Sequence, residues 1–488
     1  MKRSLLVLSV LFTATSAPRL ARATPLLEVL GPASSTGGFN PVASDPSSAS
    51  AYFNPAMLED AEDRLDVGFA LLSEQISITL DGRTASMDIP VSVGARDVVY
   101  NGKTLLPNTV VPTQWLPDRQ HDGTQPDSVT RPYLIIGGLK HLIHNRFTIG
   151  AYLALPLANL TTANAFFNDE REAIFSNSLH PELYGDRLTA MSIAVSASFR
   201  LLKQLSLGIG TTLGLANSAT SASYVPDATD YSRLLVNNTI GVTAALAPHA
   251  GVYWTPTNRI RIGATVHAPS AFVIDTTITA TLPNNTVATG TQHEVHDYMP
   301  WRASLGAEFD VIKTAHYTLG LGGEVRWMNW STYQDRHGEA PSHVNGNDPA
   351  YDFSDTFVYS AGVRHKWKKV RGYVDWQWAP SPVKDQVGRS NYVDSDRFGV
   401  AFGGDFEAVV GGVRLRPGLQ LTAYRLAWRN TVKDPKQIPD ELPDDARSSS
   451  TGDPIAGAKG LQTNNPGYPG FGMDGWIYGG TVSLAVLF

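Results

Sequence analysis

Large apolar residues alternate with small or polar ones along the last stretch of the chain. In segment 475–488, GWIYGGTVSLAVLF, every second residue from Val482 to Phe488 is large and apolar. A period of two places alternate side chains on opposite faces of a β-strand. The segment therefore predicts a strand with one apolar face, which would suit a soluble sheet as well as the wall of a membrane barrel.

The same alternation recurs along the chain and is coupled to linker length. Fourteen segments show it: 65–72, 131–141, 146–157, 188–199, 205–216, 241–254, 260–268, 301–310, 317–327, 356–367, 371–378, 397–406, 413–424 and 475–488. Linkers after even-numbered segments are short, whereas those after odd-numbered segments are mostly long and polar. This arrangement is typical of bacterial transmembrane barrels, and a soluble sandwich has no reason to follow strand parity. We predict an all-β fold, a fourteen-stranded antiparallel transmembrane β-barrel over residues 64–488.

Side-chain chemistry within these segments sorts by face. In 301–309, Leu305 and Phe309 share one face, and Arg302 and Glu308 share the other. A charge facing lipid near the bilayer midplane costs about 2–4 kcal/mol, so the polar face is expected to line the interior. Tryptophans fall near segment ends, as an interfacial aromatic girdle requires: Trp254, Trp327, Trp330, Trp367, Trp376, Trp378 and Trp476.

Both ends of the chain carry targeting features. Residues 1–23 combine Lys2 and Arg3, an apolar run too short to span a bilayer, and an Ala-Arg-Ala ending, which predicts a secretory signal peptide. Outer-membrane barrels typically end on an aromatic residue, as Phe488 does, and the tail resembles the signal read by the barrel-insertion machinery. We expect a monomer in the bacterial outer membrane, with both termini in the periplasm and with membrane lipid and lipopolysaccharide as neighbours.

Composition removes several functional classes. The net charge of −6 gives no support for nucleic-acid binding, and the absence of cysteine excludes disulfides and Cys-ligated zinc. His293, His296, His337 and His343 lack the spacing of metal ligands, and the acidic stretch 434–445 fits a solvated loop better than a Ca²⁺ site. No G-x-S-x-G nucleophile elbow is found. We therefore expect no cofactor, no metal site and no enzymatic activity.

Residues 24–63 do not alternate and are rich in small residues, a composition that would also fit a disordered leader. The stretch GFNPVASDPSSASAYFNPAML nevertheless resembles the N-terminal hatch of FadL-type outer-membrane transporters of long-chain fatty acids and other hydrophobic compounds. In that family small residues lead to an Asn-Pro-Ala turn, matched here by Asn54, Pro55 and Ala56 after the aromatic Phe53. Segments WMNWSTYQD and DTFVYSAGVRHKWKKVRGYVDWQWAPSPV resemble later strands of the same family.

The resemblance implies a barrel plugged by residues 24–63, with an apolar pocket that releases substrate sideways beside a kinked third strand. An apolar pocket favours such a ligand by about 25 cal/mol per Å² buried. Pro156 is the candidate kink, because proline donates no N–H to a ladder, although it would also suit a simple strand end. Leu157-Ala158-Asn159-Leu160 departs from the family, which usually has a glycine there.

Two sets of residues are candidates for ligand contact. Phe166, Phe167, Ile174, Phe175 and Phe272 would form an apolar capture groove, or else pack within their own loops. Arg302, Arg326 and Arg364 face inward by parity and would bind a carboxylate head group, or else pair with Glu308, Glu324 and Asp375 in the wall.

Three functions remain after these observations. The first is uptake of hydrophobic small molecules, with fatty acids before aromatic or alkane hydrocarbons. The second is an open diffusion porin, against which the hatch and the many inward glycines argue. The third is an adhesive surface barrel that acts through its long loops.

Overall fold

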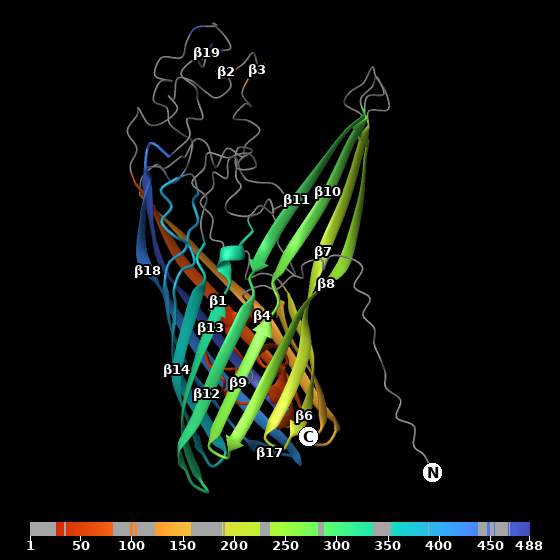
Figure 1. Cartoon of the computed structure of the whole chain (residues 1–488), viewed down its shortest axis with the longest axis vertical. Helices are drawn as coiled ribbons and strands as arrows, with labels where there is room; N and C mark the ends of the chain where they lie inside the picture. Colours follow the sequence, from red (N-terminus) through yellow and green to blue (C-terminus); the bar gives the residue numbers. More distant parts are fainter. Residues whose placement is uncertain are drawn as a thin grey trace.

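The computed structural model describes residues 26–33, 36–81, 98–100, 103–104, 123–157, 188, 191–224, 235–281, 287–334, 353–388, 390–437, 447–448, 453, 467 and 469–488. Fourteen long antiparallel strands form one closed barrel (Figure 1). They are β1 (Arg64–Leu80), β4 (Gly123–Ile143), β5 (Phe147–Pro156), β6 (Ser192–Leu202), β7 (Leu205–Tyr224), β8 (Leu235–Thr257), β9 (Ile260–His267), β12 (Arg302–Lys313), β13 (Tyr317–Met328), β14 (Thr356–Trp367), β15 (Val370–Ala379), β16 (Arg397–Phe406), β18 (Val413–Val432) and β20 (Gly470–Leu487). Each predicted segment overlaps one of these strands, so the predicted architecture is confirmed.

The barrel closes between its first and last strands. Strand β1 pairs with β20 from Arg64↔Leu487 to Leu80↔Phe471, and its other edge pairs with β4. Beyond the last pair, the Phe488 N–H donates to the Asp63 carbonyl oxygen over 3.0 Å. Every barrel strand therefore has a partner on both edges, which satisfies the backbone polar groups that a bilayer cannot hydrate.

Short turns gather at one end of the barrel, the lower end of Figure 1. Asn145 in the β4–β5 turn and Lys368 in the β14–β15 turn have φ of 57° and 54°, the left-handed conformation that tight hairpin turns require. In bacterial barrels the short turns face the periplasm. We refer to this end as the periplasmic end.

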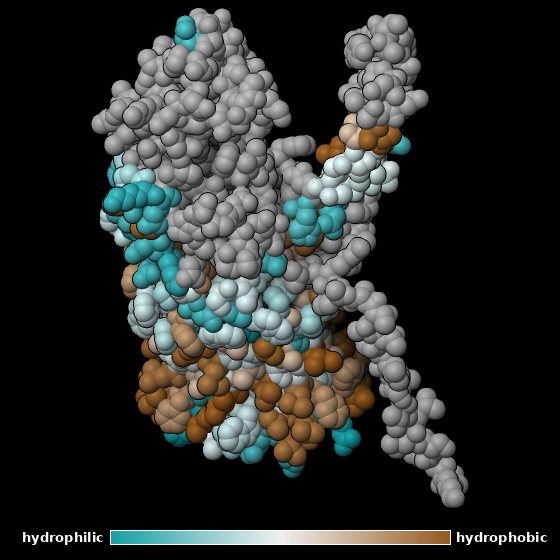
Figure 2. Space-filling model, turned by 45° about the horizontal axis from the view of Figure 1, so that its top comes forward, coloured by the Kyte–Doolittle hydropathy of each residue, from teal (hydrophilic) through white to brown (hydrophobic). Residues whose placement is uncertain are grey.

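The outer wall carries an apolar belt near the periplasmic end (Figure 2). In β12 exposure alternates along the strand: Leu305 and Phe309 are 60% and 46% exposed, whereas Ser304 and Glu308 are 8% and 7% exposed. The predicted division into an apolar outer face and a polar inner face is therefore observed. Within the described residues, no helix has the length and hydropathy needed to cross a bilayer.

Residues 26–33 and 36–63 lie inside the barrel, and we call them the luminal segment. It contains the helices α1 (Leu26–Leu30) and α2 (Ser50–Phe53) and the 3₁₀ helix η1 (Pro55–Asp60). Nearly all of its residues are buried. Helix η1 packs against β5, β6, β7 and β8, so the segment is seated low on one side of the wall.

Above the barrel mouth, a four-stranded arm replaces what the sequence indicated as long polar loops at 217–240 and 269–300. Strands β7 and β8 continue upward as a hairpin, and β10 (Ser270–Thr281) and β11 (Val287–Met299) form a second one. The hairpins join where β10 pairs with β7 in parallel, from Ile274↔Asn217 to Thr281↔Tyr224. The β10–β11 hairpin is rich in threonine, valine and isoleucine, which favour strands whether or not they contact lipid.

The remaining described elements are small. Strands β2 (Val98–Tyr100), β3 (Lys103–Thr104) and β19 (Arg447–Ser448) form a separate sheet, and β17 (Ala408–Val410) extends the turn between β16 and β18. The 3₁₀ helix η6 (Trp330–Thr332) follows β13 at the barrel mouth.

Candidate functional site

The Asn-Pro-Ala turn lies at the centre of the luminal segment. The Asn54 side chain is fully buried and caps η1, because its Oδ1 accepts from the Ala56 N–H over 3.2 Å. Its Nδ2 donates to the carbonyl oxygens of Val42 and Val252, over 2.8 and 3.1 Å. One amide therefore joins two parts of the segment to each other and to β8. Pro55 follows at the first helical position, where its missing N–H costs nothing.

Glycines of the wall make room for this turn. A Cβ on Gly208 of β7 would lie 2.3 Å from the Ala56 nitrogen, and one on Gly251 of β8 would lie 2.2 Å from Asn54 Oδ1. A Cβ on Gly263 of β9 would lie 2.0 Å from the Val42 carbonyl oxygen. Three neighbouring strands thus lack side chains where the luminal segment touches them, which allows backbone-to-backbone approach.

Aromatic and imidazole rings surround the end of α2. Phe53 packs edge-on against Tyr52, with ring centroids 5.0 Å apart. Tyr52 in turn lies 5.1 Å from His267, which stacks on His249 at 4.9 Å. The Nε2 of His249 lies 2.8 Å from the Ala51 carbonyl oxygen, so the wall also holds the backbone of α2.

Two of the predicted head-group arginines bind the luminal segment. Arg302 and Arg326 each form an ion pair with Glu28 of α1, and Arg302 also donates to the Tyr52 hydroxyl over 2.7 Å. Arg326 additionally pairs with Glu324 on its own strand, at 2.8 Å. The wall pairing considered from sequence thus exists for Arg326. Arg302 instead bonds to Glu28, a residue that no pattern in the sequence singled out.

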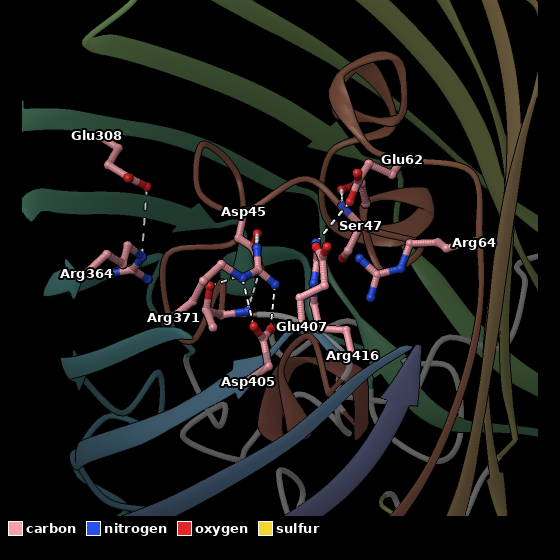
Figure 3. A network of polar contacts seen from close by, with 12 residues as sticks. Asp45, Ser47, Glu62, Arg64, Glu308, Arg364, Arg371, Asp405, Glu407 and Arg416 are labelled. Atoms are coloured by element: carbon pink, nitrogen blue, oxygen red, sulfur yellow. Dashed lines mark hydrogen bonds and ion pairs between the residues drawn. The ribbon is translucent and has the colours of Figure 1, made fainter. Parts of the chain in front are cut away.

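The third predicted arginine, Arg364, makes both kinds of contact. Its guanidinium binds Asp375 on β15 in bidentate fashion, at 2.7 and 2.8 Å, and also donates to the Gly37 carbonyl oxygen over 2.5 Å. Asp375 accepts in turn from the Phe39 N–H over 2.7 Å. Glu308 approaches Arg364 Nε at 3.9 Å (Figure 3). The charged side chains of the wall are therefore hydrogen-bonded both to each other and to the backbone of the luminal segment.

A second group of charged contacts holds the segment near the periplasmic end (Figure 3). Arg371 of β15 binds Asp45 of the luminal segment and Asp405 of the wall. Arg416 contacts Glu62 at 2.9 Å and Glu407 at 3.1 Å.

The turn residue Glu407 is ionised under ordinary conditions. Hydrogen bonds from Arg414 and then Arg416 outweigh the opposing effect of burial and lower the pKa of Glu407 to about 2. Glu62 binds the same two arginines, so this exposed cluster links the last turn of the luminal segment to the β16–β18 connection.

A small cavity lies between the luminal segment and the barrel mouth. Its volume is about 50 Å³, and its polar walls are Glu28, Arg326 and Arg397, with Tyr424 beside them. Trp330 forms part of its apolar wall and belongs to a cluster of buried rings above the segment. The other rings of this cluster, which we call the mouth cluster, are Tyr298, Tyr333, Phe353 and Tyr392.

The remaining predicted positions are dispersed. Pro156 ends β5 opposite Tyr133, two residues beyond the last β5–β6 pair at Ala154↔Ser192. Phe272 lies on β10 of the arm, where its backbone pairs with His296. The signal peptide and the residues Phe166, Phe167, Ile174 and Phe175 lie outside the described residues.

Comparisons with known proteins identify a family and a fold. The family model described as "Outer membrane protein transport protein (OMPP1/FadL/TodX)" matches residues 11–409. A FadL homologue from Pseudomonas aeruginosa superposes with a TM-score of 0.51 at 14% identity, over 96% of this chain and 99% of that chain. The toluene transporter TodX of P. putida gives a TM-score of 0.45 at 12% identity, and TbuX of Ralstonia pickettii gives 0.42 at 11%. Both likenesses cover 96% of this chain and 99% of the other.

A search of curated proteins finds no match in sequence. At 14% identity the P. aeruginosa structure supports the barrel fold alone, whereas the family model extends over more than half of the chain. The chain therefore belongs to the OMPP1/FadL/TodX family of outer-membrane proteins that transport hydrophobic compounds.

Proposed function

We propose that this protein takes up long-chain fatty acids through a barrel whose luminal segment acts as a movable hatch. The observation that carries the proposal is the cavity between Glu28 and the mouth cluster. Its aromatic side would hold an apolar chain, and Arg326 and Arg397 would hold a carboxylate. One small site therefore offers both halves of an amphipathic ligand their preferred surroundings.

The size of the cavity requires movement. Pockets that enclose small molecules typically measure about 300–1,000 Å³, far above the 50 Å³ found here. Glu28 is the group whose displacement would enlarge it, because its carboxylate occupies both Arg302 and Arg326. A ligand carboxylate that binds Arg326 and Arg397 in its place would detach α1 from the wall and keep Arg326 paired.

The rest of the route is proposed by family resemblance. Phe166, Phe167, Ile174, Phe175 and Phe272 would capture ligand outside the barrel. Asn54, Pro55 and Ala56 would shift with Phe53 as α1 detaches, and Pro156 would mark a lateral exit where β5 leaves its pairing with β6. Phe488 would engage the insertion machinery, and we expect the protein to act as a monomer among outer-membrane lipid and lipopolysaccharide.

Uptake of aromatic hydrocarbons is the second candidate, favoured by one observation. The rings of Tyr333 and Phe353 stack at 4.2 Å with an interplanar angle of 19°. A flat apolar ligand without a carboxylate would pack among such rings. Such a ligand would form no ion pair with Arg397.

Conductance in planar bilayers, with and without residues 24–63, tests the hatch. We expect the intact protein to be electrically silent and the deletion variant to open steady channels. Steady conduction by the intact protein would instead support an open porin. A mobility difference between boiled and unboiled samples on a gel is the control that both proteins form barrels.

Uptake of labelled oleate and toluene distinguishes the two substrates. We expect Arg397→Gln to reduce oleate uptake about tenfold or more, as loss of a charge-assisted contact implies, and to leave toluene uptake unchanged. Toluene uptake without oleate uptake in the unaltered protein would contradict the fatty-acid proposal.

A further inference from the structure

A groove interrupts the lipid-facing surface near the periplasmic end. It has a volume of about 430 Å³ and crosses strands β14, β15, β16 and β18. Its lining is apolar, from Val363, Val374, Phe402 and Leu419, with His365 at one end. It lies on the outside of the wall and contains none of the residues discussed above as transport candidates.

The strand register explains why the groove exists. One cross-strand row runs His365↔Gly372, Gly372↔Gly404 and Gly404↔Leu419. Two adjacent positions of this row therefore lack side chains. The His365 ring covers Gly372, since a Cβ there would lie 2.4 Å from His365 Cε1, so the open position is Gly404. The neighbouring row toward the mouth carries Val363, Val374, Phe402 and Leu421, and the row toward the periplasm carries Trp367, Val370 and Phe406.

The groove is a depression in a continuous wall. Strands β15 and β16 pair without interruption from Val370↔Phe406 to Ala379↔Arg397. A Cβ on Gly404 would lie 2.5 Å from the Arg371 carbonyl oxygen, so the two backbones are in close contact beneath the groove. A molecule in the groove thus remains on the membrane side and has no passage to the lumen.

Positive charge lies directly below the groove. Lys366 and Trp367 end β14, and Lys368 and Lys369 form the β14–β15 turn. All three lysines are exposed, and Trp367 is 57% exposed. The Lys368 ammonium lies 5.4 Å from the centre of the Trp367 ring. Among the described residues, no carboxylate forms an ion pair with these three lysines.

The carboxylate of Glu407, a residue beside this turn, does not neutralise the lysines. The Glu407 N–H donates to the Lys369 carbonyl oxygen over 2.9 Å, but its carboxylate bonds to Arg414 and Arg416. Lysines beside an interfacial tryptophan, at the level where a bilayer places its phosphates, attract anionic head groups.

We propose that the groove and the β14–β15 turn together bind an anionic phospholipid from the periplasmic leaflet. Its phosphate would lie on Lys368 and Lys369, and one acyl chain would fill the space above Gly404, beside the His365 ring. Lipid tails gain little from leaving other lipid tails, so selectivity comes from the head group, and the groove supplies a fixed place for the chain.

The test is lipid retention, measured by native mass spectrometry on protein taken from nanodiscs of equimolar phosphatidylglycerol and phosphatidylcholine. We expect the unaltered protein to retain phosphatidylglycerol about fivefold or more over phosphatidylcholine, as even one well-placed lysine implies. Lys368→Gln/Lys369→Gln should abolish this preference. Equal retention of the two lipids by the unaltered protein would overturn the proposal.

Two further variants separate the site from general effects. Arg146→Gln/Lys203→Gln removes the same charge from exposed turns elsewhere on the periplasmic rim, and it should keep the preference. An equal loss there would show a non-specific charge effect and refute the site. Leu419→Trp fills the groove from its lipid-facing wall and should lower retention of both lipids; unchanged retention would refute the acyl-chain position. Heat-modifiable mobility confirms that each variant is folded.

Discussion

The carboxylate of Glu28 binds the guanidinium of Arg326, so the first helix of the luminal segment is joined by charge to strand β13. Both side chains are largely shielded from solvent, at 14% and 11% exposure. Burying charge is tolerated only when partners are present. In the proposed uptake mechanism this contact acts as a latch, which opens at low cost only when another anion replaces Glu28.

Glu28→Gln should loosen the luminal segment. Removing one member of a buried ion pair typically costs about 3–5 kcal/mol, because the other charge is left uncompensated. Here Arg302 loses its carboxylate partner, and Arg326 keeps only Glu324. We expect intermittent channel openings in planar bilayers where the unaltered protein is silent. Asp474→Asn is the matched control, since Asp474 pairs with Arg425 away from the segment, and it should stay silent. Silence of both variants would show that the latch does not hold the segment.

Gly263→Ala should displace the segment by crowding. The added methyl group would meet the Val42 carbonyl oxygen at 2.0 Å, which is backbone and cannot rotate away. Overpacking of this kind costs about 1–3 kcal/mol, and the loss should appear as faster protease cleavage within residues 36–63. Gly138→Ala is the control, because its nearest neighbour would lie 3.5 Å away. Equal cleavage rates for the two variants would show that the luminal segment is not closely packed against Gly263.

The pH dependence of the periplasmic cluster has a defined sign. The pKa of Glu407 falls from 4.5 to about 2 on folding, so its contribution to stability is complete above pH 4.5 and is lost as the pH falls toward 2. Melting temperatures of the unaltered protein and Glu407→Gln should differ at pH 7 and converge near pH 2. The difference should be small and should shrink with salt, since the group is exposed. A difference that grows on acidification would reverse the sign and refute the assignment.

The strands of the barrel wall could all be predicted from the sequence. Alternation identified all fourteen strands because each has one face on lipid and one on a polar interior, and that contrast is written residue by residue. Strands β10 and β11 were not predicted because the arm has no such contrast. The pairing of β10 with β7 depends on a parallel contact between segments more than fifty residues apart.

The ion pairs inside the barrel could be predicted from the sequence only in part. The inward direction of Arg302, Arg326 and Arg364 follows from parity, and the partners Glu324 and Asp375 lie on the same or an adjacent strand. Glu28 follows from neither, because it belongs to a five-residue helix without periodicity. The ion pairs between the luminal segment and the wall depend on how the segment folds inside the closed barrel. No local sequence pattern predicts them.

The closing pair Arg64↔Leu487 also constrains the order of assembly. Strand β1 follows the luminal segment directly, whereas its partner β20 begins only at Gly470. The seam of the barrel therefore forms from residues at opposite ends of the sequence, the kind of distant contact that folds slowly. Until that seam forms, the segment has an incomplete wall around it, so the segment is fully enclosed only when the barrel closes.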